Sequence, residues 1–273
     1  MPILIPAFNN SLSIFFRCGK HAIASQFQYV PLGNVITGIK KLGFDRVLEV
    51  ATGADMVAYK EGLELVEKGF LTSSCCPAFV KYIETKHPAM VPHISHNLSP
   101  MAELGRAIKE HEPDVKIVFI GPCIAKKAEI KKEKVSPYVD YVITFEELQA
   151  LFDSRDITLR DQEPTEWNQA SYYGRMFATS GGVAAAVAEI LKELKVENFE
   201  LNAISCDGID KCKPALLKAS KGVSPYNFIE GMICTRGCVG GMGNPTWRED
   251  ISEEIEEHAE EAEITEILTH LVL

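Results

Sequence analysis

Cysteine is the residue type in this chain whose number and spacing could do chemistry. The chain has 273 residues, of which 8 are cysteines. Thiolates are soft ligands, and sets of four cysteines suit zinc or iron–sulfur clusters. Disulfides in a secreted protein are the other use of so many cysteines, but a chain of this size does not need them and two of its cysteines are adjacent. We therefore expect a reducing, cytoplasmic location, with cysteines kept for metal binding or catalysis.

Most of the cysteines occur in three short segments. These are Leu71–Phe79 with Cys75 and Cys76, Gly121–Glu129 with Cys123, and Glu230–Gly243 with Cys234 and Cys238. Cys234 and Cys238 are four residues apart, so one helical turn could direct both at the same centre. The glycines that follow would let backbone N–H groups approach cluster sulfurs. The CxxC pairs of a zinc ribbon and the closely spaced cysteine run of a ferredoxin are missing from the sequence, so neither site is expected.

The other cysteines and the histidine pair have simpler interpretations. Cys18 is interpreted as a buried small hydrophobic residue. For Cys206 and Cys212 the same interpretation and a structural role typical of a family stay equally open. His93 and His96 follow a proline and are interpreted as surface residues rather than metal ligands.

The elements that must position these segments follow from hydrophobic patterning. Short β-branched runs alternate with helical patterns, which is typical of parallel α/β layers. Strands are expected at 46–51, 116–121, 139–144 and 201–205, and helices at 33–42, 54–68, 99–112, 145–153, 182–195 and 209–219. Ser99-Pro100 indicates a helix start, and Thr144 with Glu147 matches a capping box.

Composition excludes some classes of function. Lys and Arg number 28 against 38 Asp and Glu, giving a net charge of −10, and an acidic chain repels phosphate backbones. No apolar run approaches the roughly 18 residues that span a bilayer, so we expect no membrane insertion. Residues 1–20 are apolar but lack a basic leader region, and we interpret them as folded chain.

The last segment, Arg248–Leu273, is rich in glutamate. Its apolar residues recur at Ile251, Ile255, Ala259 and Ala262, and this spacing predicts an amphipathic helix. We expect a solvated terminal helix rather than a device for binding a partner.

Three motifs together carry a resemblance to a known family. The chain has SSCCPAF, PCIAKKAE and EGMICTRGCVGG, in that order, over some 170 residues. They resemble the three signatures of the H-cluster domain of iron-only (FeFe) hydrogenases, and the similarity extends from about residue 30 to 245 without the accessory ferredoxin-like domains of larger members. The resemblance implies two lobes of mostly parallel sheet flanked by helices, with a metal cluster in the cleft between them. Residues 1–247 would form this domain and 248–273 the acidic helix.

The resemblance also implies the cofactor and its ligands. A 4Fe–4S cluster would be held by four thiolates, those of Cys76, Cys123, Cys234 and Cys238. Cys238 would also bridge to a diiron subcluster that carries CO, cyanide and a bridging dithiolate. Because one protein bond would hold the diiron unit, its orientation must come from surrounding donors and shape.

Further residues match positions around that cofactor. Cys75 is similar to the thiol that moves protons to and from the dithiolate, and Lys126 to a lysine that donates a hydrogen bond to cyanide. Met232 is similar to a residue that packs against the bridging CO. Ser99 and Gly181 fall at positions next to the cofactor. Glu129 and Glu230 occupy acidic positions of the motifs, for which we expect structural roles.

A proton path is implied by three more matches. Glu61 and Glu64 lie three residues apart on one face of the expected helix 54–68. Ser95 falls where the family has a relay serine. The expected path runs Glu64–Ser95–Glu61–Cys75, and the other interpretation of the two glutamates is an exposed pair.

The chain departs from the family at two positions near the cofactor and at its start. Gly121 and Met101 stand where the prototypes have methionine and glutamine, and residues 1–20 fit poorly. The resemblance implies an enzyme of anaerobic metabolism that catalyses 2H⁺ + 2e⁻ ⇌ H₂, with a ferredoxin-like carrier or redox subunit, together with cofactor maturation proteins, as partners. Two alternatives stay open: a hydrogen sensor with the same cofactor, and an iron–sulfur assembly protein without the diiron unit.

Overall fold

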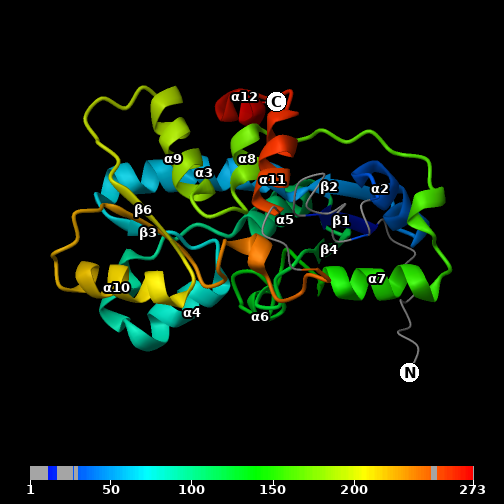
Figure 1. Ribbon diagram of the computed structural model, residues 1–273. Helices are drawn as coiled ribbons and strands as arrows, with labels where there is room; N and C mark the ends of the chain where they lie inside the picture. Colours follow the sequence, from blue (N-terminus) through cyan, green and yellow to red (C-terminus); the bar gives the residue numbers. More distant parts are fainter. Residues whose placement is uncertain (1–11, 17–26, 28–29, 247–250, 273) are drawn as a thin grey trace.

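The computed structural model describes residues 12–16, 27, 30–246 and 251–272, and its strands form two parallel sheets (Figure 1). The first sheet has the order β2-β1-β4-β5, with β1 at Leu12–Phe16, β2 at Arg46–Glu49, β4 at Lys116–Ile120 and β5 at Tyr141–Ile143. The second has the order β3-β7-β6, with β3 at Leu71–Thr72, β6 at Ala203–Asp207 and β7 at Phe228–Met232. All of these strand pairs are parallel, as the alternation of strand and helix patterns predicts.

Helices cover both faces of the first sheet. Alternate residues of a strand point to opposite sides, and β4 has apolar side chains on both sides that must be covered. Val118 and Ile120 of β4 pack on one face with α2 (Leu32–Lys41) and α7 (Phe145–Ser154). Ile117 and Phe119 pack on the other with α5 (Pro100–His111). Both faces are buried, which explains why β4 is continuously apolar from Ile117 to Ile120 rather than alternating.

The second sheet is also covered on both faces. Leu71 and Phe228 pack with α3 (Val50–Lys68) and α9 (Gly182–Glu193). Ile229 packs on the other face with α4 (Pro77–Lys86) and α10 (Ile209–Ser220). The long helix α3 packs against α5 on the first sheet and α9 on the second, so it joins the two lobes.

Two expected helix starts can be compared with the structure. Thr144 accepts from the backbone N–H of Glu147 at 3.2 Å and the Glu147 carboxylate accepts from the backbone N–H of Thr144 at 2.8 Å, so the capping box is confirmed. Helix α5 begins at Pro100 as predicted, but the Ser99 side chain makes no capping hydrogen bond. None of the described helices is long and apolar enough to cross a membrane.

The acidic C-terminal segment forms two helices where the spacing predicted one. Helix α11 (Ile251–Glu260) lies against α8 (Tyr172–Met176), and α12 (Ile267–Val272) lies against α3 and α9. Ile251, Ile255 and Ala259 are buried, and Ala262 lies beyond the end of α11. The predicted apolar face therefore exists and packs onto the protein, while most of the glutamates of α11 are exposed. Cys18 and most of residues 1–20 lie outside the described residues, as does the expected boundary at 247–248.

Candidate metal centre

The cysteines of the three motifs lie just beyond the carboxyl ends of strands from both sheets. Cys76 precedes α4 and follows β3, Cys123 follows β4, and Cys234 and Cys238 follow β7. Side chains at the carboxyl ends of parallel strands share one edge of their sheet. The two edges meet here, because the backbone N–H of Gly243 donates to the carbonyl of Pro122 at 2.8 Å.

The electrostatics of the thiols indicate that four of them form one group. Burial raises the pKa of Cys76 to about 11, and the neighbouring Cys238 and Cys123 raise it further. Burial likewise raises the pKa of Cys234 to about 12, with contributions from the other three thiols. The raised pKa values of Cys76 and Cys234 would fall once a cationic metal centre bound these sulfurs as thiolates.

The spacing of this group tests which kind of metal it fits. Within the described ranges, no three Cys, His, Asp or Glu side chains lie close enough together to hold a single metal ion. Ligands of a 4Fe–4S cluster bind separate irons at its corners and so stand further apart than the ligands of one zinc ion. Four cysteine thiolates are a donor set that suits an iron–sulfur cluster.

The turn that carries Cys238 depends on close backbone approaches. Gly237 has a φ of 79°, and a β-carbon added there would lie 2.8 Å from the Met232 sulfur. A β-carbon on Gly241 would lie 2.5 Å from the Pro122 carbonyl oxygen. The backbone N–H of Cys238 donates to the carbonyl of Ala178 at 2.9 Å. These contacts fix the turn against the motif that carries Cys123.

Lys126 is the buried cation of the site. Its side chain is 1% exposed, and its Nζ donates to Glu129 Oε2 at 2.5 Å and to the carbonyl oxygen of Cys75 at 3.3 Å. Lys131, Lys132 and Lys134, which follow in the same lysine-rich run, are more exposed. A charged ammonium held beside the Cys75 backbone can orient an anionic ligand.

Glu230 has the structural role that was expected. Its buried carboxylate accepts from the backbone N–H groups of Gly181 at 2.8 Å and Ala184 at 2.9 Å, and from the hydroxyl of Ser205 at 3.2 Å. Burial raises the pKa of Glu230, which these donors lower only in part. The Gly181 N–H is thus occupied in closing the first turn of α9, and a contact of Gly181 with a cofactor stays a prediction.

Glu61 is a completely buried carboxylic acid. Its Oε1 accepts from the backbone N–H of Ser74 at 3.2 Å, while its Oε2 has no hydrogen-bond partner among the described residues. Burial raises its pKa to about 7; the Ser74 N–H and the nearby Ser95 hydroxyl lower it in part, and Glu64 raises it. A carboxyl group that titrates near neutral pH can both take up and release a proton.

Ser95 connects the two glutamates. Its hydroxyl donates to Glu64 Oε2 at 3.1 Å, and it also lies near enough to Glu61 to affect that pKa. Glu64 also accepts from Lys68 Nζ at 2.6 Å and from Asn97 Nδ2 at 2.8 Å. Against burial, Lys68 and the backbone N–H of His96 hold the pKa of Glu64 below the ordinary value. The structure thus brings these three residues together in the predicted order, from the partly exposed Glu64 to the buried Glu61.

Cys75, Met232 and Ser99 are all buried. Cys75 and Met232 are 2% and 1% exposed and belong to the apolar cluster between α3 and α9. The Ser99 hydroxyl is buried and has no hydrogen-bond partner among the described residues. A small cavity of about 40 Å³ lies beside Ser74, Ser95 and Ser99.

Some residues of the site region were not found from the sequence. Asn97 and His96 bind Glu64, the latter through its backbone N–H at 3.1 Å. Gly231 sits between Glu230 and Met232, and a β-carbon there would lie 2.1 Å from the ring of Phe79. Neither polar residues in a loop nor a glycine in a strand carries a pattern that points to such contacts.

Comparisons with known proteins agree with this architecture. A sequence profile described as the C-terminal domain of the "Iron only hydrogenase large subunit" matches residues 16–242. Iron hydrogenase 1 of Clostridium pasteurianum is 30% identical over 261 residues, covering 78% of this chain and 45% of that protein. The periplasmic Fe hydrogenase large subunit of Nitratidesulfovibrio vulgaris is 29% identical, covering 83% of this chain and 66% of that protein. The chain therefore spans about half to two thirds of these relatives.

A second group of relatives is named for another role. The cytosolic Fe–S cluster assembly factor NAR1 of Kluyveromyces lactis is 30% identical over 169 residues, covering 57% of this chain and 35% of that protein. Among solved structures, a variant of the FeFe-hydrogenase HydA1 from Chlamydomonas reinhardtii superposes with a TM-score of 0.73 at 20% identity, covering 96% of this chain and 87% of the other. The profile match over most of the chain shows that this protein belongs to the family of C-terminal domains of iron-only hydrogenase large subunits.

Proposed function

We propose that this protein is a hydrogenase that interconverts protons and H₂ according to 2H⁺ + 2e⁻ ⇌ H₂. The observation that carries the proposal is the group of four thiols with the buried Lys126 beside Cys75. A diiron unit linked to a 4Fe–4S cluster would supply, when bound, the iron at which H₂ forms and is split. The remaining chemistry belongs to the chain's own residues.

The thiolates of Cys76, Cys123, Cys234 and Cys238 would hold the 4Fe–4S cluster, with Cys238 shared with the diiron unit. Lys126 would donate to an anionic cyanide ligand, and the ion pair with Glu129 supports this role because it keeps the lysine in the buried region. Met232 would limit the space beside the cofactor, because its sulfur packs against Gly237 next to Cys238. Ser99 would offer its unpartnered hydroxyl.

Proton movement would use the residues that join α3 to the 95–97 loop. Glu64 exchanges a proton with the surface, the Ser95 hydroxyl passes it to Glu61, and the Cys75 thiol carries it to the reacting centre. A raised pKa of about 7 suits Glu61 to this task, because either protonation state is then accessible at neutral pH. Electrons would come from a separate ferredoxin-like carrier or redox subunit, and maturation proteins would build the diiron unit.

The location is also part of this proposal. None of the cysteines in the described ranges forms a disulfide. Reduced thiols kept for a cluster suit a cytoplasmic protein of anaerobic metabolism. One relative is named as periplasmic, so fractionation of the native cells is the direct check.

The test is reconstitution under anaerobic conditions with iron and sulfide, followed by installation of the diiron unit. We expect an iron–sulfur absorption spectrum, infrared bands of CO and cyanide, and H₂ evolution from reduced methyl viologen. Cys234→Ala is the matched control and should lose the cluster. A wild-type chain that carries both spectroscopic signatures but evolves no H₂ would contradict the enzymatic proposal.

Two specific observations favour other candidates. The similarity to NAR1 favours an iron–sulfur assembly role, in which the CO and cyanide bands would stay absent after maturation. The buried Gly121 and Met101, which replace the prototypes' methionine and glutamine, favour a hydrogen sensor. A sensor would show the infrared bands with slow turnover and would bind a signalling partner in an H₂-dependent way.

A further inference from the structure

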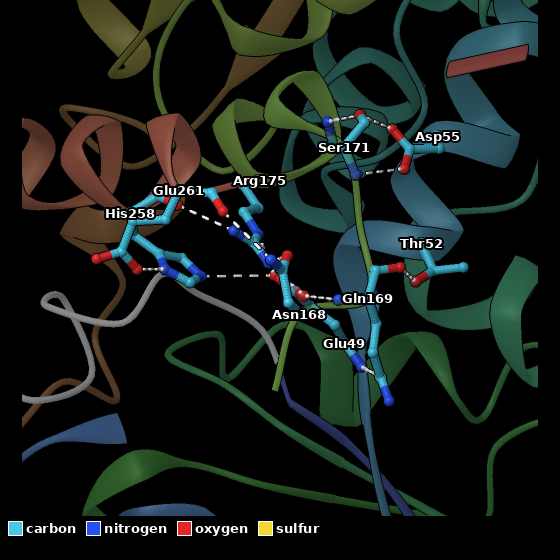
Figure 2. A network of polar contacts seen from close by, with 10 residues as sticks. Glu49, Thr52, Asp55, Asn168, Gln169, Ser171, Arg175, His258 and Glu261 are labelled. Carbon is cyan, nitrogen blue, oxygen red and sulfur yellow. Dashed lines mark hydrogen bonds and ion pairs between the residues drawn. The ribbon is translucent and has the colours of Figure 1, made fainter. Parts of the chain in front are cut away.

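A buried network of charges fastens α11 to the rest of the protein (Figure 2). Glu49 at the end of β2, Arg175 of α8 and His258 of α11 are 2%, 3% and 1% exposed. Arg175 Nε donates to Glu49 Oε1 at 2.9 Å, and its NH1 donates to the carbonyl oxygen of His258 at 3.0 Å. His258 Nε2 lies 3.7 Å from Glu49 Oε1. Three segments far apart in sequence therefore meet around the Arg175–Glu49 ion pair.

The charges in this network depend on one another. Burial alone would raise the pKa of Glu49, but His258 and Arg175 bring it below its ordinary value. His258 Nδ1 faces Glu261 Oε2 at 3.4 Å. Removing one partner of a buried ion pair leaves an uncompensated charge, which is strongly unfavourable. The contact of α11 with α8 is thus specific and not only an apolar packing.

The same helices lead directly to the turn that carries Cys238. Ile251 and Ile255 of α11 pack against Val239, the residue after Cys238, and Met176 of α8 packs against the same cluster. Two residues beyond Met176, the carbonyl of Ala178 accepts the backbone N–H of Cys238. Helix α11 therefore touches the Cys238 turn on one side and holds α8, which supports the turn, on the other.

We propose that Arg175 and His258 are positioning residues for Cys238, acting through α8 and α11. The network attaches α8 to Glu49 at the start of α3, and so sets where the Cys238 turn lies relative to the lobe that supplies Cys123. The sequence profile of the family ends at residue 242, so α11 lies beyond the matched region. The inference rests on the proposed function in one respect, that Cys238 is a cluster ligand.

The first experiment uses the metal-free full chain and hydrogen exchange. His258→Ala should speed exchange of the Cys238 amide by about tenfold or more, because the Ala178 carbonyl that accepts it loses its support. Glu257→Ala, on the exposed face of the same helix, is the control and should leave this amide unchanged. Faster exchange confined to residues 251–260, with the Cys238 amide protected as before, would overturn the proposal.

The second experiment uses the chain loaded with its iron–sulfur cluster. We expect His258→Ala to change the electron paramagnetic resonance g-values and the midpoint potential of the cluster, with wild-type behaviour in Glu257→Ala. His258→Gln keeps a polar side chain beside Glu49 and leaves the backbone carbonyl bound by Arg175 in place, so it should restore most of the wild-type spectrum. If His258→Ala unfolds, Arg175→Lys, which keeps the charge but loses the two-sided contact, provides the same comparison.

The two proposals fail in different ways. A wild-type chain that binds no cluster refutes the assignment of Cys238 as a ligand, while the exchange experiment on the metal-free chain still decides the role of His258. A loaded His258→Ala variant with lower thermal stability but unchanged g-values and potential shows a purely structural network. That result refutes the positioning role and leaves the proposed function intact.

Discussion

The hydroxyl of Ser95 donates a 3.1 Å hydrogen bond to Glu64, and the same serine lies beside Glu61. It thus lies between a carboxylate whose pKa is lowered and a carboxyl group whose pKa is raised to about 7. Two acids of one helix are held in different states by their surroundings, with the proton-binding group on the buried side. This difference in environment agrees with the proposed proton path, in which the buried acid takes up and releases a proton.

Glu61→Gln should abolish most turnover while keeping the fold. Glutamine retains an acceptor for the Ser74 N–H but cannot relay by ionising, so we expect H₂ evolution to fall by about 10²–10⁴-fold. The cluster spectrum should be unchanged. Near-wild-type activity in a fully loaded variant would rule out this path.

The same substitution should also change how the stability of the metal-free chain depends on pH. A carboxyl group whose pKa is raised by folding favours the folded state below its ordinary pKa, and this contribution is lost as pH rises through about 7. Glutamine does not ionise, so the Glu61→Gln variant does not lose stability as the pH rises. Its unfolding free energy should exceed that of wild type by roughly 3 kcal/mol well above pH 7. Urea unfolding of the metal-free chain at pH 5 and pH 9 measures this. Glu64→Gln is the contrasting control. Folding lowers the pKa of Glu64, so ionised Glu64 stabilises the folded chain above its ordinary pKa, and this contribution is lost in acid.

Cys75→Ala should separate proton delivery from cluster binding. Cys75 is buried among apolar side chains and adjoins Cys76, the expected ligand. A thiol can carry a proton and a methyl group cannot, so turnover should be lost with the iron–sulfur and infrared spectra intact. Loss of the spectra in this variant would instead make Cys75 part of the metal site.

Lys126→Met should destabilise the metal-free chain. It leaves the Glu129 carboxylate buried without its partner, and breaking a buried ion pair in this way costs about 3–5 kcal/mol. The double variant Lys126→Met/Glu129→Leu removes both charges and should regain most of this stability. Chemical denaturation at neutral pH provides the comparison. If both variants unfold at the same denaturant concentration, the ion pair does not account for the stability of α6 (Lys126–Glu129).

Acid should loosen α11 through Glu49. Folding lowers the pKa of Glu49 from its ordinary 4.5, so its contribution is present above that value and is lost as pH falls through the lower folded-state pKa. Glu49→Gln should be less stable than wild type at pH 7 by about 3–5 kcal/mol, because Arg175 loses its buried partner. This difference should shrink as pH falls below 4.5. A difference that stays constant with pH would show that Glu49 is not the titrating group.

The sequence predicts the parallel α/β frame, while the roles of the residues in the cysteine motifs stay predictions. The spacing of the cysteines within their motifs predicts metal binding. The parallel order of the strands brings these motifs to the carboxyl edges of the two sheets. Lys126 could be separated from its neighbours only by its place in PCIAKKAE, and its burial agrees with that choice. The expected strands do not include β1, β3 and β7. Strand β1 lies in the N-terminal stretch that fits the family poorly, β3 has two residues, and β7 carries Glu230 and Gly231, which are poor strand formers.

In the C-terminal segment, the sequence pattern predicts a helix but not the residues that the helix contacts. The spacing of Ile251, Ile255 and Ala259 correctly predicts an amphipathic helix, but not what its apolar face touches. Glu49, Arg175 and His258 are separated by up to 209 residues and have no local motif, so only the folded chain reveals that they meet. Long-range ion pairs of this kind leave no periodicity in the sequence.

The contact of Gly231 with Phe79 has a consequence for how this protein can vary. The strand that supplies Glu230 and Met232 admits the phenylalanine ring only because residue 231 lacks a side chain, and an added β-carbon would lie 2.1 Å from it. Phe79 of the first motif and Gly231 of the third are therefore a sterically coupled pair that links the two motifs. A larger residue at position 231 would be tolerated only after residue 79 had been replaced by a smaller one. The order of the two substitutions is therefore constrained as well as their outcome.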